Sequence, residues 1–251
     1  MTRAPFDAHA HLDATLSPRA IARAGYVLAM TLSSAEAAVA LARADPRVVW
    51  GVGCHPRRAR AVRSFDRDEF TQLARRTPVV GEIGLDATSR VPAAEQVAAF
   101  RGALDVARDL GRVVSVHPHK TSTAVLDELQ RRMPPAAILH WWSGDADETR
   151  RAVRLGCFFS VHRAVARRLV WRDVPPERLL IESDIGYAER PADAPMLVAR
   201  TEAMLAERIG AEPRAVREFA WRALAAMVYS SGTADLWPSA FRQRLRGGRP
   251  R

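Results

Sequence analysis

Eight short runs rich in Val, Ile, Leu and Phe alternate along this chain with longer stretches of helical periodicity. The runs cover residues 4–9, 25–32, 47–55, 79–86, 112–117, 136–142, 157–162 and 178–184. In the connector 93–110, Val97, Phe100, Leu104 and Leu110 share one stripe of a helix. Strands that alternate with helices form a parallel sheet, and eight of them most commonly close into a barrel. The sequence therefore predicts an α/β protein of the (β/α)8 TIM-barrel class.

The domain organisation follows from the same pattern. The chain has 251 residues, 48% of them hydrophobic, which is ample for one packed core. We expect a single barrel domain over residues 1–240, with helices at about 193–209 and 213–229 covering the barrel after its last strand. The remaining residues, 241–251, are rich in arginine and glycine and predict a frayed basic tail.

The cellular setting is predicted from what the sequence lacks. The chain opens without the signature of a secretory signal, and no apolar run reaches the roughly 18 residues of a membrane span. We expect a cytoplasmic protein with no membrane partner. Cys54 and Cys157 lie in apolar runs and are expected to be buried free thiols. The formal charge of +10 modestly favours a polyanionic partner, because a basic surface attracts phosphate backbones.

Polar residues gather at the ends of the predicted strands. His9 and His11 close the first run, and residues i and i+2 of a strand point to one face. The others are Glu82 in the fourth run, His117 at the end of the fifth, His140 late in the sixth and Asp184 at the end of the eighth. One histidine alone is more often structural than a ligand. Because a barrel carries its active site at the carboxyl ends of its strands, the joint placement predicts a metal site there.

The motifs "HAHLD", "GCHP", "GEIGLD", "SVHPHK", "LHWWSGD" and "IESD" follow one another along the chain. In order and spacing they resemble the TatD-like metal-dependent hydrolases, an amidohydrolase-like branch of the (β/α)8 barrels, from about residue 6 to residue 187. The segments "TAVLDEL", "LHWWSGD" and "GCFFSV" are most similar to TatD-type nucleases of Qat anti-phage cassettes. The resemblance implies a divalent-metal DNase, with 3′ to 5′ exonuclease activity on single-stranded DNA and a role in anti-phage defence.

Carried over residue by residue, the resemblance implies two divalent metal ions. It assigns His9, His11 and Asp184 to one ion, His117 and His140 to the second, and Glu82 to the bridge. Two cations about 3.5 to 4 Å apart suit an in-line displacement at phosphorus. Glu82 and Asp184 are then the catalytic carboxylates, with Asp184 as the base that accepts the proton of the attacking water. Mixed histidine and carboxylate ligation leaves Zn, Mn and Mg open.

Substrate contacts are expected from the loops after the strands. Arg57 and Arg58 follow "GCHP" and either bind phosphate oxygens or begin a solvated helix. The resemblance places His55 on the substrate side. His119 and Lys120 stand where the family commonly has arginine, so one of them has to supply the positive charge. Tyr187 is also expected at the substrate, although Gly186 precedes it where the family usually has proline.

Two aromatic residues and two deep carboxylates complete the predicted site. Strict alternation after an inward-pointing His140 sends Trp141 toward the helices and Trp142 toward the mouth, where it would stack on a base. Asp7 and Glu182 lie two residues before His9 and Asp184, one layer deeper on the same face. They are either partners that orient the histidines or a structural polar layer.

Two other classes of function remain open at this point. The same dinuclear site could serve a different hydrolase, such as a deacylase of tRNA ends or an amidohydrolase of small molecules. Alternatively, the barrel could be a non-catalytic subunit that binds protein partners in a defence cassette. The presence of all six proposed ligands argues against the second class, since a protein without activity has usually also lost a ligand.

Overall fold

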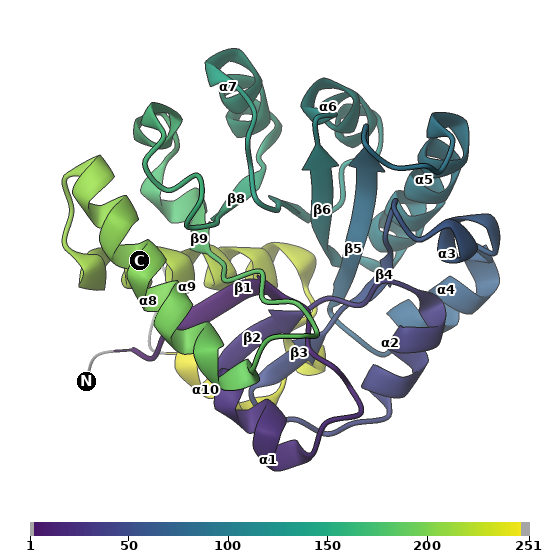
Figure 1. Ribbon diagram of the computed structural model, residues 1–251, viewed down its shortest axis with the longest axis horizontal. Helices are drawn as coiled ribbons and strands as arrows, with labels where there is room; N and C mark the ends of the chain where they lie inside the picture. Colours follow the sequence, from purple (N-terminus) through teal and green to yellow (C-terminus); the bar gives the residue numbers. More distant parts are fainter. Residues whose placement is uncertain (1–2, 247–251) are drawn as a thin grey trace.

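The computed structural model describes residues 3–246, with parallel strands at the centre and helices α2 to α8 around them (Figure 1). The strands are β1 (Phe6–Ala10), β2 (Tyr26–Ala29), β3 (Val48–Trp50), β4 (Val52–Cys54), β5 (Val79–Asp86), β6 (Val113–His119), β7 (Ala136–Leu139), β8 (Phe158–Val161) and β9 (Leu179–Ile181). Every neighbouring pair is parallel. The predicted α/β barrel of the TIM class is confirmed.

The third predicted strand, 47–55, is two strands and not one. β3 pairs with β2, β4 pairs with β5, and Gly51 separates them. A Cβ atom at Gly51 would lie 2.8 Å from both the Gly81 carbonyl oxygen and the Met30 sulfur, so the bend needs a glycine. This one run therefore links the three-stranded sheet β1-β2-β3 to the six-stranded sheet β4 to β9.

The barrel closes between its last and first strands. The Asp184 amide donates to the His9 carbonyl at 3.0 Å, and the His11 amide donates to the Ile185 carbonyl at 2.8 Å. These two bonds lie just beyond β9 and at the end of β1. Closure therefore joins the two segments that carry His9, His11 and Asp184.

The helices fill the connections between the strands. They are α1 (Pro18–Ile21), α2 (Ser34–Leu41), α3 (Ala59–Arg63), α4 (Arg67–Ala74), α5 (Ala93–Leu110), α6 (Ser122–Arg131), α7 (Ala146–Leu155), α8 (Ala194–Ile209), α9 (Pro213–Ser231) and α10 (Ser239–Arg246). Short 3-10 helices cover Ala22–Ala24, Leu169–Arg172, Pro176–Arg178, Pro191–Asp193 and Ala234–Leu236. The helices expected at 93–110, 193–209 and 213–229 are α5, α8 and α9. Among residues 3–246, no helix is both long and apolar enough to cross a membrane.

Helices α9 and α10 close the amino end of the barrel with aromatic side chains. Trp221 on α9 packs against Phe6 and Tyr26, and its indole N–H donates to the Ala4 carbonyl at 2.9 Å. Phe241 on α10 is fully buried in the same cluster. The prediction of a frayed tail from residue 241 was therefore wrong for 241–246, because burial of Phe241 holds this segment as a helix. Residues 247–251 lie outside the described part of the chain.

Candidate metal centre

Glu82 on β5 is 1% exposed and lies at the centre of a cluster of histidines. Ring nitrogens of five histidines lie within 3.6 Å of its carboxylate oxygens: His117 Nδ1 at 2.5 Å, His11 Nε2 at 3.1 Å, His9 Nε2 at 3.5 Å, His55 Nε2 at 3.5 Å and His140 Nε2 at 3.6 Å. These residues come from β1, β6 and the segments that follow β1, β4 and β7. The carboxyl ends of the strands thus gather residues that are far apart in the sequence around one carboxylate.

The Glu82 carboxylate keeps one oxygen free of hydrogen bonds to the described residues. This atom, Oε2, is buried, and His9 and His11 face it. A buried polar atom without a partner costs free energy unless something else satisfies it. Imidazole nitrogens and carboxylate oxygens are the donor set of Zn and related divalent ions. The residues present therefore fit a divalent metal.

Three groups of potential ligand atoms overlap in this cluster. They are His9, His11 and Glu82; His55, Glu82 and His117; and His9, His140 and Glu182, with the ligand atoms of each group within 4.8 Å of one another. Glu82 and His9 each belong to two groups. The geometry therefore gathers several potential ligands around Glu82, and it brings His55 within ligand reach as well.

Asp184 approaches the cluster from the segment that follows β9. Its Oδ1 lies 3.8 Å from His9 Nε2 and 3.7 Å from His11 Nε2. The residue has a φ of 48°, a left-handed conformation that is unusual for a residue with a side chain. Asp7 holds the flanking backbone, because its Oδ1 accepts from the Ser183 amide at 3.0 Å and the His9 amide at 3.2 Å. Asp7 thus fixes the backbone on both sides of the site.

Polar partners behind the cluster set the orientation of the histidine rings. Glu182 is fully buried and accepts from His140 Nδ1 at 3.0 Å, from the Trp141 amide at 2.9 Å and from the Ser160 hydroxyl. His9 Nδ1 bonds the Ser115 hydroxyl at 2.9 Å, and His11 Nδ1 donates to the Met30 carbonyl at 3.1 Å. Of the two roles predicted for the deep carboxylates, the orienting one describes Glu182. Each of these bonds leaves the Nε2 atom directed at the centre.

Burial and mutual attraction shift the protonation of these groups in opposite directions. Burial lowers the pKa of His9 to about 3. Burial alone would also lower the pKa of His140, but the carboxylates of Glu182, Asp184 and Glu82 raise it to about 10. Burial raises the pKa of Asp184 to about 6, whereas the surrounding histidines outweigh burial at Glu82 and hold its pKa well below the usual range.

Asp86 belongs to the centre and was missed in the sequence. Its Oδ2 lies 3.1 Å from His117 Nε2 and 3.8 Å from Arg57 Nε, and the residue is 2% exposed. Asp86 is four residues after Glu82 on the same strand, and this even spacing puts both carboxylates on one face. The signal was therefore present in "GEIGLD".

Known proteins are similar to this chain in sequence and in fold. The family model of the TatD related DNases matches residues 6–228. The chain belongs to the TatD-related DNase family. A TatD metal-dependent hydrolase of Mycobacterium tuberculosis is 32% identical over 84% of this chain and 92% of that protein. A 3′-5′ ssDNA/RNA exonuclease TatD of Edwardsiella piscicida is 31% identical over 68% of this chain and 73% of its own length.

Solved TatD structures share the architecture. The Escherichia coli TatD homologue YjjV superposes with a TM-score of 0.73 at 22% identity, over 90% of this chain and 97% of that one. A TatD-family hydrolase of Entamoeba histolytica gives a TM-score of 0.68 at 13% identity, over 91% of this chain and 99% of the other. At these identities the likeness establishes the fold. The sequence relationship makes this member of the family a metal-dependent hydrolase.

A cavity of about 400 Å³ opens beside the candidate metal centre. Its lining residues are Arg57, Asp86, His117, Pro118, His119, His140, Trp141, Ser143 and Asp184. Arg57 and His119 are exposed at its edge. Arg58 and Lys120 are exposed as well but are not among these lining residues. Of the predicted phosphate contacts, Arg57 and His119 therefore have the placement that such a role needs.

Tyr187 lies on a different side of the centre. Its ring centroid is 6.0 Å from that of His11, and its hydroxyl donates to Glu36 Oε2 at 2.8 Å. It lines a second cavity of about 440 Å³ together with Leu12, Thr31 and Val39. The structure thus separates Tyr187 from the cavity that holds Arg57 and His119.

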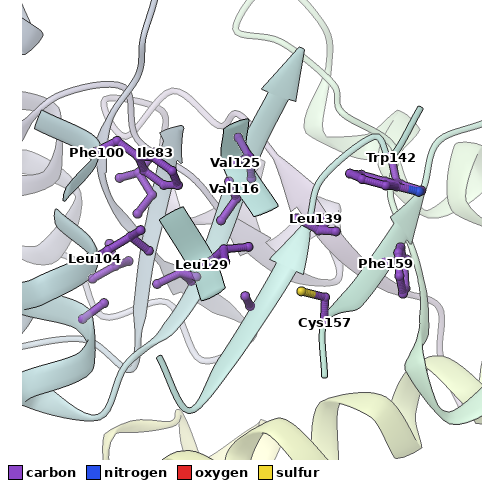
Figure 2. Packing of buried hydrophobic residues seen from close by; sticks show 14 of the residues in the cluster. Ile83, Phe100, Leu104, Val116, Val125, Leu129, Leu139, Trp142, Cys157 and Phe159 are labelled. Atoms are coloured by element: carbon purple, nitrogen blue, oxygen red, sulfur yellow. The ribbon is translucent and has the colours of Figure 1, made fainter. Parts of the chain in front are cut away.

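The predicted directions of the two tryptophan side chains are wrong, because Trp142 is buried and Trp141 faces the cavity. Trp142 is fully buried, donates from its indole N–H to the Thr149 hydroxyl at 2.8 Å, and packs on Phe159 in the core (Figure 2). Trp141 is half-buried and lines the cavity. Alternation fails because β7 ends at Leu139 and Trp141 has a left-handed φ of 40°. Trp142 is therefore part of the core and not of the cavity lining.

Proposed function

We propose that this TatD-family hydrolase is a nuclease that cleaves phosphodiester bonds of single-stranded DNA from the 3′ end with two divalent ions. The observation that carries the proposal is the convergence of histidines and carboxylates on Glu82, whose buried Oε2 has no hydrogen-bond partner among residues 3–246. Relatives named 3′-5′ ssDNA/RNA exonucleases support the nucleic-acid substrate and the polarity. The cavity beside the centre supplies an exposed guanidinium group at Arg57 for the phosphate.

In this proposal the metal ligands are those implied by the family resemblance. His9, His11 and Asp184 would hold one ion, His117 and His140 the other, and Glu82 both. The distances from Glu82 to the four histidines, all within 3.6 Å, support this arrangement. We keep His55 on the substrate side, although its Nε2 is 3.5 Å from Glu82 Oε1 and makes it the nearest substitute ligand.

The roles of the protein groups follow from their placement. When bound, the divalent ions would lower the pKa of water and neutralise charge at phosphorus. Asp184 would take up the proton that the water loses. Arg57 would bind a phosphate oxygen through its guanidinium group. Glu182 would keep the His140 ring directed at the centre.

The test combines metal analysis with digestion of end-labelled oligonucleotides. Purified protein should contain divalent metal by mass spectrometry, and should shorten 5′-labelled single-stranded DNA progressively while releasing the label at once from 3′-labelled DNA. Glu82→Gln should lose both metal and cleavage, whereas the matched control Glu207→Gln, 75% exposed on α8, should keep them. Intact DNA and RNA with metal-loaded wild type would contradict the proposal, and cleavage of aminoacyl-tRNA esters instead would favour a deacylase.

A role in anti-phage defence in the cytoplasm, with partner proteins from the same cassette, is the biological part of the proposal. Its support is the similarity of "TAVLDEL", "LHWWSGD" and "GCFFSV" to nucleases of Qat cassettes. Cells that carry the neighbouring genes with the wild-type protein should form fewer phage plaques than cells with Glu82→Gln. Equal plaque counts would remove the defence role and leave the nuclease activity untouched.

A further inference from the structure

We propose that Trp141 is a platform on which one base of the substrate stacks beside the metal centre. The inference rests on the proposed function, because it assumes a nucleic-acid strand in the cavity. It adds a recognition element beyond the metal ligands. It also assigns the part of the substrate, an unpaired nucleobase, that this element contacts.

The backbone holds Trp141 in place at the edge of the metal centre. Its amide donates to Glu182 Oε1 at 2.9 Å, and Glu182 also bonds His140. The Trp141 and His140 rings are 6.3 Å apart and nearly perpendicular, at 86°. One buried carboxylate therefore sets both the position of a centre histidine and the position of the indole.

His162 supports the indole from behind. The two ring centroids are 3.7 Å apart with an interplanar angle of 35°, and His162 is 6% exposed. His162 is itself held, since its Nδ1 accepts from the Ala164 amide at 3.3 Å. Burial lowers the pKa of His162, which keeps the ring neutral and suited to stacking on an aromatic neighbour. Because one face of the Trp141 ring packs against His162, the indole is held in the cavity wall before a substrate binds.

The rest of the cavity complements a nucleotide. Arg57 and His119 line it with Trp141, and Asp184 and His140 lead to the metal centre. Its volume of about 400 Å³ falls within the range of small-ligand sites, about 300 to 1,000 Å³. A cationic side chain such as Arg57 near the backbone and an aromatic ring that stacks a base are the two elements of sequence-tolerant binding to single strands. A base inside a duplex cannot offer a free face, so this arrangement favours unpaired strands and frayed ends.

The test compares two oligonucleotides of equal length, one of thymidine nucleotides and one of abasic tetrahydrofuran residues with the same phosphodiester backbone. Binding and cleavage are measured separately, on wild type and Trp141→Ala. For the thymidine strand, Trp141→Ala should weaken binding about 5- to 150-fold, the factor that corresponds to base–aromatic stacking. For the abasic strand, binding should change by less than about twofold, because no base is there to stack. Tyr229→Ala, an aromatic truncation 90% exposed on α9, serves as the control.

Variants of the supporting histidine separate stacking from a structural role. His162→Ala should reproduce part of the Trp141→Ala defect on the thymidine strand only, whereas His162→Phe, which restores an aromatic support, should bind like wild type. If Trp141→Ala weakened binding of the thymidine strand and the abasic strand equally, or weakened neither, the stacking platform would be overturned. Wild type that prefers the thymidine strand but cleaves neither would refute the proposed function while supporting the platform. Failure to bind either strand would overturn both.

Discussion

The two ends of the barrel differ in what fills them. At the amino end, Phe6, Tyr26, Trp221 and Phe241 pack into one aromatic cluster under α9 and α10. At the carboxyl end, the interior space is occupied by histidines and carboxylates around Glu82. The aromatic cluster lowers the free energy of the folded state by removing apolar surface from water. The buried polar groups raise it because they lose their hydration, and a bound ion can offset this cost. Stability and chemistry are thus assigned to opposite ends of the same strands.

The largest expected effect is at the carboxyl end. Glu82→Ala removes the carboxylate around which four proposed histidine ligands gather, so hydrolysis should fall by more than about 100-fold, since even residues that only orient ligands are worth about 10- to 100-fold. Metal content should fall with it, while circular dichroism should show a native barrel. Wild-type turnover in this variant would show that hydrolysis at the carboxyl end does not depend on Glu82.

The matching change at the amino end should affect stability and spare the metal. Trp221 is fully buried between Phe6 and Tyr26, so Trp221→Ala should cost about 3 to 5 kcal/mol in free energy of unfolding. Tyr229→Ala on the same helix is exposed and should change it by about 0.5 kcal/mol or less. Denaturant melts and metal content together check this. Loss of metal from folded Trp221→Ala would mean that the two ends are coupled.

A smaller effect is expected one layer below the centre. Glu182→Gln removes the charge that holds His140 and the Trp141 amide, so metal affinity should fall about 10- to 100-fold. Titration with Zn or Mn checks this. The matched control is Glu207→Gln, which is exposed on α8. Unchanged affinity in Glu182→Gln would make Glu182 a structural residue only.

Metal binding should release protons at neutral pH. With its pKa raised to about 10, His140 carries a proton at pH 7 in the metal-free protein, and a ligand nitrogen has to lose it. Affinity should therefore fall as pH is lowered, by about tenfold per pH unit for each proton released. Below pH 6 the competition grows, because Asp184, with a pKa of about 6, also takes up a proton. Calorimetry in two buffers of different ionisation enthalpy measures the protons released, and identical heats would contradict the prediction.

The smallest expected effect concerns the rim of the carboxyl end. Replacing Arg57 and Arg58 together with Gln should flatten the salt dependence of single-strand binding, by about 0.7 in log–log slope for each phosphate that the protein no longer neutralises. Because Arg57 lines the cavity and Arg58 does not, we expect Arg57→Gln alone to account for most of the change. Metal content should stay at the wild-type level. A slope that is unchanged in the double variant would remove both arginines from the substrate path.

The sequence alone determined the architecture and the end of the barrel at which polar groups meet. Eight apolar runs separated by helical stretches predict the closed parallel sheet, because burial of such strands on both faces leaves few alternatives. The same pattern located His9, His11, His117 and His140 at or near the strand ends and Glu82 within a strand. These inferences succeed because they depend on periodicity, which is local. Whether the converging residues bind metal stays a prediction.

Tertiary structure alone decided how the side chains meet. The left-handed φ of Trp141 exchanged the expected directions of two neighbouring tryptophan side chains, and burial of Phe241 turned a predicted tail into α10. The contact of Asp86 with His117 and the support of Trp141 by His162 join different strands. None of these follows from periodicity, because each depends on where a strand ends and which residues face it across the barrel. A shift of one residue at a strand end reverses the direction of a side chain, and only packing selects between the two.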